Sequence, residues 1–280
     1  MKLLRFGETG REKPGLLDKD GHVRDLSAHV KDITADVVSP DGLKRLAAIN
    51  PAELPRVPSG VRMGAPVAGI SKLVAIGLNY ADHAAEAGMQ LPTEPIFFIK
   101  APTSICGPDD NVEKPRGSTK LDWEVELGFV IGTKAKYVSE ADAMNYVAGY
   151  CIGNDVSERN YQLERGGTWT KGKSHDTFGP LGPWLVTKDE VADPHNLKMW
   201  LDVNGERQQS GSTATMVFKL PKLISYVSQF LTLLPGDVVV TGTPPGVGSG
   251  KKPPRFLNVG DVMTLGIDGL GTQRQHIVAA

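Results

Sequence analysis

The chain contains the stretch Asp122-Trp123-Glu124-Val125-Glu126-Leu127-Gly128, in which acidic side chains alternate with mainly apolar ones. Because side chains along a β-strand point to opposite faces with a period of two, this pattern predicts a strand over 123–131 with its carboxylates on one face. Such a cluster costs free energy unless a cation neutralises it or water solvates the face. The stretch therefore indicates either a cation site or the exposed edge of a sheet.

A second stretch favours the cation site. Gly149-Tyr150-Cys151-Ile152-Gly153-Asn154-Asp155 predicts an apolar strand over 147–154 that is followed at once by an acid. Since sites are commonly built at the ends of strands, Asp155 becomes a third candidate ligand beside Glu124 and Glu126. An all-carboxylate ligand set favours Mg²⁺ or Mn²⁺ over zinc, and none of the six histidines has a zinc-site spacing. The metal would act as a Lewis acid on a substrate that chelates it through a carboxylate and a neighbouring keto oxygen.

The remaining pattern predicts a mixed, β-rich α+β fold. Prolines between 51 and 66 interrupt regular structure, so we expect a small N-terminal domain over 1–65 and a larger one over 66–280. A tight turn is expected at Asp18-Lys19-Asp20-Gly21 within the strand pair of 15–26. Three helices are expected, over 80–87, after Ser139 with Asp142 completing a capping box, and from Pro221 onward. Further strands are expected at 2–6, 72–77, 184–187, 199–204, 237–241 and 262–267.

Composition excludes several classes of partner. The 280 residues include 31 basic and 32 acidic side chains, so the formal net charge of -1 gives no reason to expect binding to nucleic acid or to a charged membrane. Cys106 and Cys151 form no Cys-x-x-Cys pair and cannot build a dense disulfide framework. No signal-peptide core or membrane-spanning run is visible, and we therefore expect a cytoplasmic protein.

Two further groups could take part in chemistry. His83 and Glu86 lie three residues apart on the helix predicted over 80–87, so they form either a general base with its orienting carboxylate or an ordinary exposed pair. Lys173 is either a cation that faces the metal site or a surface lysine. The run Gly167 to Ser174 matches the P-loop pattern, but it follows a polar segment instead of a buried strand, so we reject nucleotide binding.

Taken together, these stretches resemble the fumarylacetoacetate hydrolase superfamily from Leu73 to the C-terminus. The resemblance rests on the order of several short motifs along the chain. They are Gly77-Leu78-Asn79-Tyr80 with His83 and Glu86, Phe97-Phe98-Ile99-Lys100, residues 122–128, Asn154-Asp155-Val156-Ser157-Glu158-Arg159, Lys171-Gly172-Lys173-Ser174 and Gly242-Thr243-Pro244.

The resemblance implies a β-roll catalytic domain, a homodimer, and a magnesium or manganese ion held by Glu124, Glu126 and Asp155. It also implies a water-activating dyad and a lysine near the substrate oxygens, which would be His83 with Glu86 and Lys173. Positions that look like substrate contacts are Tyr80, Lys100, Arg159, Gln162 and Thr243. Two departures affect what the pocket accepts: Leu78 stands where many members have arginine, and His175 where many have phenylalanine.

The activity that this resemblance implies is hydrolysis of the C3–C4 bond of a 2,4-diketo acid, which gives pyruvate and a second carboxylic acid. The expected substrate is a 2,4-diketo-3-deoxy sugar acid of the rhamnonate or fuconate type, or an acylpyruvate. Decarboxylation of oxaloacetate and isomerisation of a 2-hydroxy-diene-dioate could use the same site. A different class, a catalytically silent relative that only binds a ligand, is also open, because a fold does not fix a function.

Overall fold

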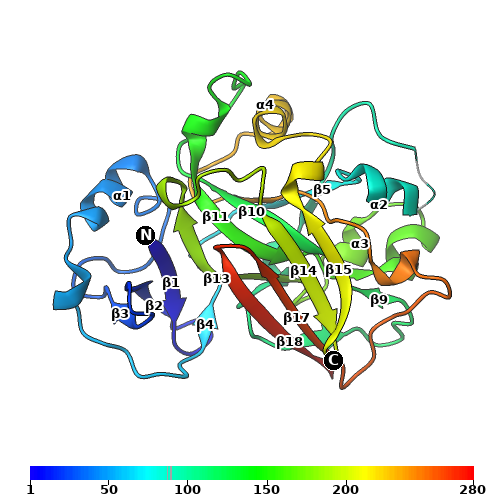
Figure 1. Cartoon of the computed structure of the whole chain (residues 1–280), viewed down its shortest axis with the longest axis horizontal. Coiled ribbons are helices and arrows are strands. Elements are labelled where there is room, and N and C mark those ends of the chain that lie inside the picture. The colour runs from blue at the N-terminus through cyan, green and yellow to red at the C-terminus, as the bar shows by residue number, and fades with distance from the viewer. Residues whose placement is uncertain (87, 89) are drawn as a thin grey trace.

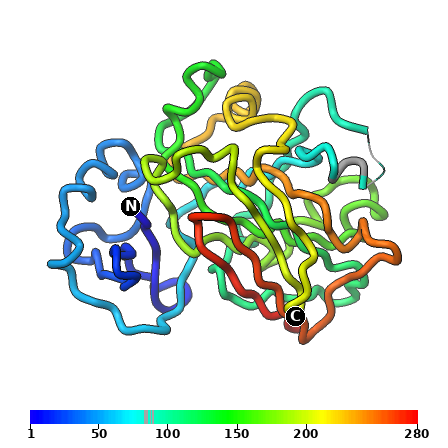
Figure 2. The backbone as a smooth tube through the Cα atoms, in the orientation of Figure 1, coloured from blue at the N-terminus to red at the C-terminus, as the bar shows by residue number. Residues whose placement is uncertain are grey.

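The computed structural model describes residues 1–86, 88 and 90–280, and among these the side chains of all but 83–85. Figure 1 shows a core of sheets with few helices, and Figures 1 and 2 both show the N-terminal segment to one side of it. The largest sheet runs in the order β3-β2-β1-β13-β11-β10-β16-β5-β6, with β4 on β1 and β7 on β13. Its strands are β1 (Lys2–Phe6), β2 (Lys13–Leu17), β3 (Val23–Asp25), β4 (Met63–Gly64), β5 (Leu73–Gly77), β6 (Ile96–Lys100), β7 (Ile105–Cys106), β10 (Val125–Ile131), β11 (Val147–Asn154), β13 (Gly179–Thr187) and β16 (Val238–Val240).

A second sheet packs across the first. It comprises β15 (Glu206–Ser212), β14 (Lys198–Val203), β17 (Val262–Ile267), β18 (Gly271–Ala279) and β8 (Val112–Lys114), in that order. Strands β14 and β17 contact β10, and β18 contacts β11 and β13, so the main apolar core lies between these sheets. A short ladder joins β9 (Leu121–Asp122) to β12 (Ser157–Glu158). The helices are α1 (Pro40–Ala47), α2 (Ala81–Glu86), α3 (Thr170–Lys173) and α4 (Leu220–Phe230).

The antiparallel pair of β10 and β11 determines where the acidic residues meet. The first residue of β10, Val125, pairs with the last residue of β11, Asn154. Just beyond this pair, the backbone N–H of Asp155 donates to the carbonyl of Glu124 at 2.9 Å. Alternate residues of β10, including Leu127 and Phe129, enter the main core, which leaves Glu126 on the opposite face. One strand end and the start of its neighbour therefore carry the three acids.

Glycines let β11 lie close to the strands that flank it. A Cβ at Gly149 would come 2.2 Å from the carbonyl oxygen of Val186 in β13, and one at Gly153 would come 2.6 Å from Cγ1 of Val240 in β16. Since real side chains do not approach that closely, any larger residue would force the strands apart. The close packing fixes the end of β11, and hence Asp155.

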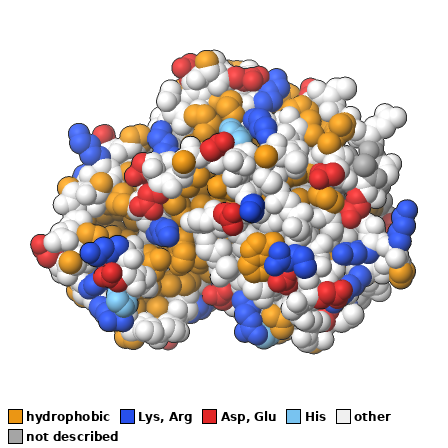
Figure 3. Space-filling view, in the orientation of Figure 1, with side chains coloured by type: hydrophobic (Ala, Val, Ile, Leu, Met, Phe, Trp, Pro, Cys, Tyr) orange, Lys and Arg blue, Asp and Glu red, His pale blue; other side chains and the backbone are white. Residues whose placement is uncertain are grey.

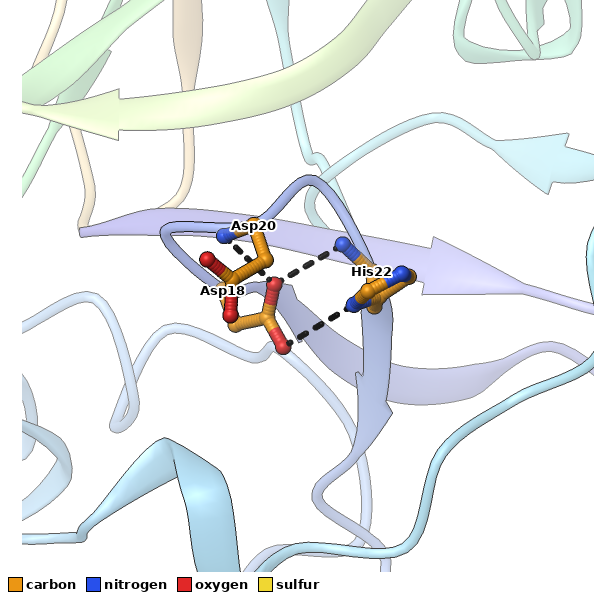
Figure 4. A group of neighbouring side chains, drawn as sticks. All are labelled: Asp18, Asp20 and His22. Carbon is orange, nitrogen blue, oxygen red and sulfur yellow. Dashed lines mark hydrogen bonds and ion pairs between the residues drawn. The ribbon is translucent and has the colours of Figure 1, made fainter.

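The N-terminal hairpin has the turn that the sequence predicts. Strands β2 and β3 pair in antiparallel register, and the Asp18 carboxylate accepts hydrogen bonds from the backbone N–H groups of Asp20 and His22 at 2.9 and 2.8 Å (Figure 4). Arg24 Nε donates to the same carboxylate at 2.7 Å. These bonds, with the His22 backbone bond as the largest cause, lower the pKa of Asp18 from 3.8 to about 2. The cluster of Asp18, Asp20 and His22 is thus explained by the turn itself.

Most expected elements are confirmed, and one is wrong. The strands at 2–6, 147–154 and 262–267 match closely, and α4 begins with Pro221 in its first turn and buries Leu223, Ile224 and Val227. The α-helix expected after Ser139 is absent. The Ser139 hydroxyl does accept from the Asp142 backbone at 3.2 Å, but only one 3₁₀ turn, Ala143–Tyr146, follows before β11 begins. The end of the helix expected over 80–87 lies partly outside the described residues.

One face of the molecule carries charged side chains of both signs. On the face shown in Figure 3, basic and acidic side chains are interspersed, and apolar side chains gather over the N-terminal segment and its junction with the rest. Strands β1 to β3 extend the large sheet, because β1 pairs with β13. The division into two domains near residue 65 therefore stays a prediction. The homodimer also stays a prediction. No helix among the described residues is long and apolar enough to cross a membrane.

We expect Gly149→Ala to destabilise the protein by about 1–3 kcal/mol, the usual cost of overpacking a core. The new methyl group would collide with a carbonyl that the pairing of β11 with β13 holds in place. The matched control is Gly179→Ala, whose methyl group would come no closer than 3.0 Å to a neighbouring atom, at Cδ2 of Leu73, and 3.3 Å to a backbone oxygen, that of Ser104. Urea unfolding gives the free energy of unfolding of both variants, and an equal loss of stability in the two would contradict the packing argument.

We expect Asp18→Asn to make stability less dependent on pH in acid. Because folding lowers the pKa of Asp18, its contribution is complete above about pH 4 and is lost as the pH falls toward about 2. The substitution removes that contribution at pH 7 and flattens the decline below pH 4. Urea unfolding at pH 7 and pH 3 measures the free energy of unfolding at each pH. If that free energy falls by the same amount from pH 7 to pH 3 in the variant and in the unaltered protein, the prediction is wrong.

Candidate active site

Glu124, Glu126 and Asp155 come together as the sequence predicts. Each offers a carboxylate oxygen within 4.8 Å of the others, and all three residues are at most 6% exposed. They meet because Glu124 precedes β10, Glu126 lies within it and Asp155 follows β11. Three carboxylates at such distances, shielded from water, repel one another strongly unless positive charge lies beside them.

Three buried cations supply part of that charge. Lys173 Nζ donates to Glu124 Oε2 at 2.8 Å and to Asp155 Oδ2 at 2.7 Å. Lys100 Nζ donates to the other oxygen of Asp155, and Arg159 Nη2 donates to Glu124 Oε1 at 2.6 Å. Burial alone would lower the pKa of Lys173, but Asp155 and Glu124 outweigh burial and raise it. Lys173 is therefore an ammonium ion set between two of the three acids.

Glu126 is compensated differently. Among the described residues it has no ion pair with a lysine or arginine, and its Oε2 accepts only the backbone N–H of Gly242, at 2.7 Å. Burial raises the pKa of Glu126 well above its ordinary value, and the charges of Asp155 and Glu124 raise it further. A carboxylate in this situation either keeps its proton or faces a cation. Oxygen-only donors of this kind fit a divalent ion such as Mg²⁺ or Mn²⁺.

The loop of residues 242–250 connects this triad to helix α2. Its backbone N–H groups donate to Glu126 from Gly242 at 2.7 Å, and to both oxygens of Glu86 from Gly246 at 3.0 Å. Gly248 and Ser249 donate to Asp122 at 2.6 and 3.0 Å. One loop thus anchors three carboxylates that come from different parts of the chain.

The structure describes the side chain of only one of the two residues of the predicted water-activating dyad, His83 and Glu86. His83 lies on α2, but its side chain is outside the described residues, so its orientation toward Glu86 stays a prediction. Glu86 is anchored at the loop, where a Cβ at Gly250 would come 2.5 Å from its Cγ and Cδ. Glycine at 250 is therefore what lets this carboxylate approach the loop.

The predicted substrate contacts fall into two groups. Arg159, Gln162 and Thr243 line a cavity together with the triad and Lys173. Tyr80 and Lys100 are fully buried and are not among its lining residues. The Tyr80 hydroxyl contacts Met199 Sδ at 3.4 Å. The substrate-binding role of all five stays a prediction, and for Lys100 the visible role is to compensate the charge of Asp155.

Sequence reasoning placed Asp122 differently from the structure. The alternating acids predict Asp122 on the same face as Glu124, but the strand is interrupted between β9 and β10, and Asp122 instead binds Arg159 Nε at 2.8 Å. Buried Gln209 was missed altogether. Its amide oxygen accepts a hydrogen bond from the backbone N–H of Val125 at 3.0 Å, and its amide nitrogen donates one to the hydroxyl of Thr243 at 2.8 Å. The polar run Glu206–Ser212 gives no periodic signal that would have marked this strand.

Apolar residues form most of the remaining wall of the cavity, which Ser249 also lines. The apolar ones among its described lining residues are Ile76, Leu78, Phe98, Leu163 and Trp169, with Gly77 between the first two. The cavity therefore has a charged floor built by the triad, Arg159 and Lys173, and an apolar wall beside it. A small acid whose two ends differ in polarity fits such a site.

Comparison with known proteins gives the family. The model described as the fumarylacetoacetate (FAA) hydrolase C-terminal domain matches residues 72–278. A Burkholderia lata protein named only as a hydrolase is 61% identical over 277 residues, which cover 99% of this chain and 98% of that protein.

Solved structures of similar proteins carry more specific names. A 2-hydroxyhepta-2,4-diene-1,7-dioate isomerase from Mycobacterium marinum is 32% identical with a TM-score of 0.75, covering 100% of this chain and 98% of that one. A maleylpyruvate hydrolase from Sphingobium sp. SYK-6, solved with manganese(II) and pyruvate, is 29% identical with a TM-score of 0.83 over 100% of both chains. Because the family model spans well over half of its residues, this chain belongs to the fumarylacetoacetate hydrolase family of enzymes.

Proposed function

We propose that this protein hydrolyses the C3–C4 bond of a 2,4-diketo acid with the aid of a bound divalent ion. The observation that supports the proposal best is the triad itself, since buried Glu126 faces two further carboxylates with no cationic side chain of its own among the described residues. Glu124, Glu126 and Asp155 would hold Mg²⁺ or Mn²⁺, and the ion would supply Lewis-acid chemistry to the 1-carboxylate and 2-keto oxygen of the substrate.

Lys173 would stabilise the charge that develops during cleavage. Its ammonium lies between Glu124 and Asp155 and lines the cavity, so it can donate a hydrogen bond to a substrate oxygen. When the C3–C4 bond breaks, its electron pair passes to C3 as the enolate of pyruvate, and a nearby positive charge lowers the energy of that enolate. Protonation at C3 then gives pyruvate.

Water activation is assigned to His83. In this proposal Glu86, held by the Gly246 backbone, orients the imidazole, which takes a proton from water as the water oxygen adds to C4. The C4 side leaves as a carboxylic acid that carries the added oxygen. Atoms therefore balance with water as the only co-substrate.

A second candidate is isomerisation of a 2-hydroxy-diene-dioate. It is favoured by the name of the Mycobacterium marinum neighbour and by the fact that enolate stabilisation would serve both reactions. The two differ in products, because an isomerase releases no pyruvate. Oxaloacetate decarboxylation does release pyruvate, so carbon dioxide must be measured with it.

Pyruvate release from a panel of 2,4-diketo acids and oxaloacetate tests the proposed activity. We expect cleavage of a diketo acid with Mg²⁺ or Mn²⁺, no cleavage with EDTA, and a loss of at least about a hundredfold in Glu126→Gln, or roughly 2.7 kcal/mol of barrier. Glu140→Gln, at an exposed acid, is the control and should keep full activity. Cleavage that survives both EDTA and Glu126→Gln would refute the metal assignment.

Thermal unfolding separates a ligand role for Glu126 from a structural one. Mn²⁺ at about a hundred times its dissociation constant should stabilise the unaltered protein by about 2.7 kcal/mol. Glu126→Gln should lose that response and yet be no less stable without metal, because it replaces a carboxyl group whose ionised form is disfavoured by burial and by the charges of Asp155 and Glu124. A variant that is unstable without metal but still responds to Mn²⁺ would indicate that Glu126 serves the fold instead.

A further inference from the structure

The apolar wall of the cavity is held in place by its neighbours. A Cβ at Gly77 would come 2.6 Å from Cζ3 of Trp169, so the glycine is what allows the indole to lie against β5. Trp169 in turn packs edge-on against Phe98, with ring centroids 5.2 Å apart. Both rings line the same cavity as the triad. They form a fixed aromatic surface beside the charged floor.

Leu78 and Leu163 extend this surface. Leu78 lies in the left-handed backbone region with a φ of +52°, a conformation that costs a non-glycine residue free energy. Leu78 nevertheless lines the cavity and is only 9% exposed. Leu163 lies in the π-helical turn Asn160–Glu164 and is 55% exposed although it lines the cavity. A leucine that is open to water at the rim of a site has apolar area left to cover with ligand.

The described cations that line the cavity are already engaged. Arg159 donates from Nε to Asp122, from Nη1 to Gln162 and from Nη2 to Glu124. Lys173 is shared by Glu124 and Asp155. A second carboxylate at the far end of a ligand would therefore lose its hydration against leucine and aromatic side chains without gaining a cation, which is costly.

We infer that the distal group of the substrate is uncharged and apolar. The substrate is then a monocarboxylic acylpyruvate, whose acyl chain lies against Leu78, Phe98, Leu163 and Trp169. Leu163 determines this specificity at the rim. Of the two substrate classes that the sequence resemblance implies, the geometry thus favours the acylpyruvate over the polyhydroxylated sugar acid. This inference rests on the proposed function for the cleavage step, but the selectivity can be measured without cleavage.

Binding of uncleavable ligands tests the selectivity. 2-Oxoheptanoate and 2-oxoheptanedioate lack the 4-keto group, have equal chain length and differ only in the distal carboxylate. In calorimetric titrations with Mg²⁺ present, we expect the monoacid to bind at least about tenfold more tightly. Equal binding, or tighter binding of the dioate, overturns the inference whether or not the protein cleaves any diketo acid.

Leu163→Arg should reverse the preference, because it places a cation at the rim where the distal carboxylate would lie. The dioate should gain and the monoacid should lose affinity, each by several-fold. Leu163 is exposed, so the variant should fold, and circular dichroism checks this. Leu234→Arg is the matched control, because Leu234 is also exposed but does not line the cavity, and it should leave both affinities unchanged. If the ratio of the two affinities is unchanged in Leu163→Arg, then Leu163 does not determine the specificity.

Cleavage of a matched pair separates this inference from the proposed function. Values of kcat/KM for 2,4-dioxoheptanoate should exceed those for 2,4-dioxoheptanedioate by at least about tenfold, and a polyhydroxylated diketo acid should also be poor. If neither of the pair is cleaved while the monoacid still binds more tightly, the hydrolase proposal fails and the apolar site stands. If the dioate is the better substrate, the hydrolase proposal stands and the apolar site fails.

Discussion

The burial of carboxylates is the constraint on which this structure depends. Asp122, Glu124, Glu126 and Asp155 are all almost wholly removed from water, and each must be compensated where it lies. Arg159 bridges Asp122 to Glu124, and Lys173 bridges Glu124 to Asp155. The compensation is thus shared, and removing one cation would leave two acids exposed to each other's charge.

The same constraint explains the shape of the loop at 242–250. Backbone N–H groups can approach Glu126, Glu86 and Asp122 only because glycine occupies the positions of closest contact. Gly246 has a φ of +107°, and a Cβ there would come 2.0 Å from the carbonyl oxygen of Gln208. The turn that begins at Gly242 is therefore part of the electrostatic framework of the site.

Much of this site could be predicted from the sequence because its acids belong to local patterns. Strand periodicity placed Glu124 and Glu126 near each other, and an acid at the end of an apolar strand identified Asp155.

The features that the sequence did not predict depend on contacts between distant parts of the chain. The pairing of β9 with β12 in place of β11 turned Asp122 toward Arg159, and no local pattern reveals such a change of partner. Strand β15 is polar, and its role depends on Gln209 reaching β10 across the sheets. The helix expected after Ser139 is absent, because only one 3₁₀ turn, Ala143–Tyr146, fits before β11 begins.

The loop at 242–250 also bears on how the molecule folds. Gly246 of the loop binds Glu86, which lies 160 positions earlier in the chain, and Gly242 binds Glu126, which lies 116 positions earlier. Contacts of such long range form late, because the entropy of closing the intervening chain must be overcome first. The triad gains its Gly242 hydrogen bond only when these segments have docked. Under the proposed function, affinity for the metal ion would therefore report complete tertiary structure, since a chain with all its strands formed but this loop undocked would bind the ion poorly.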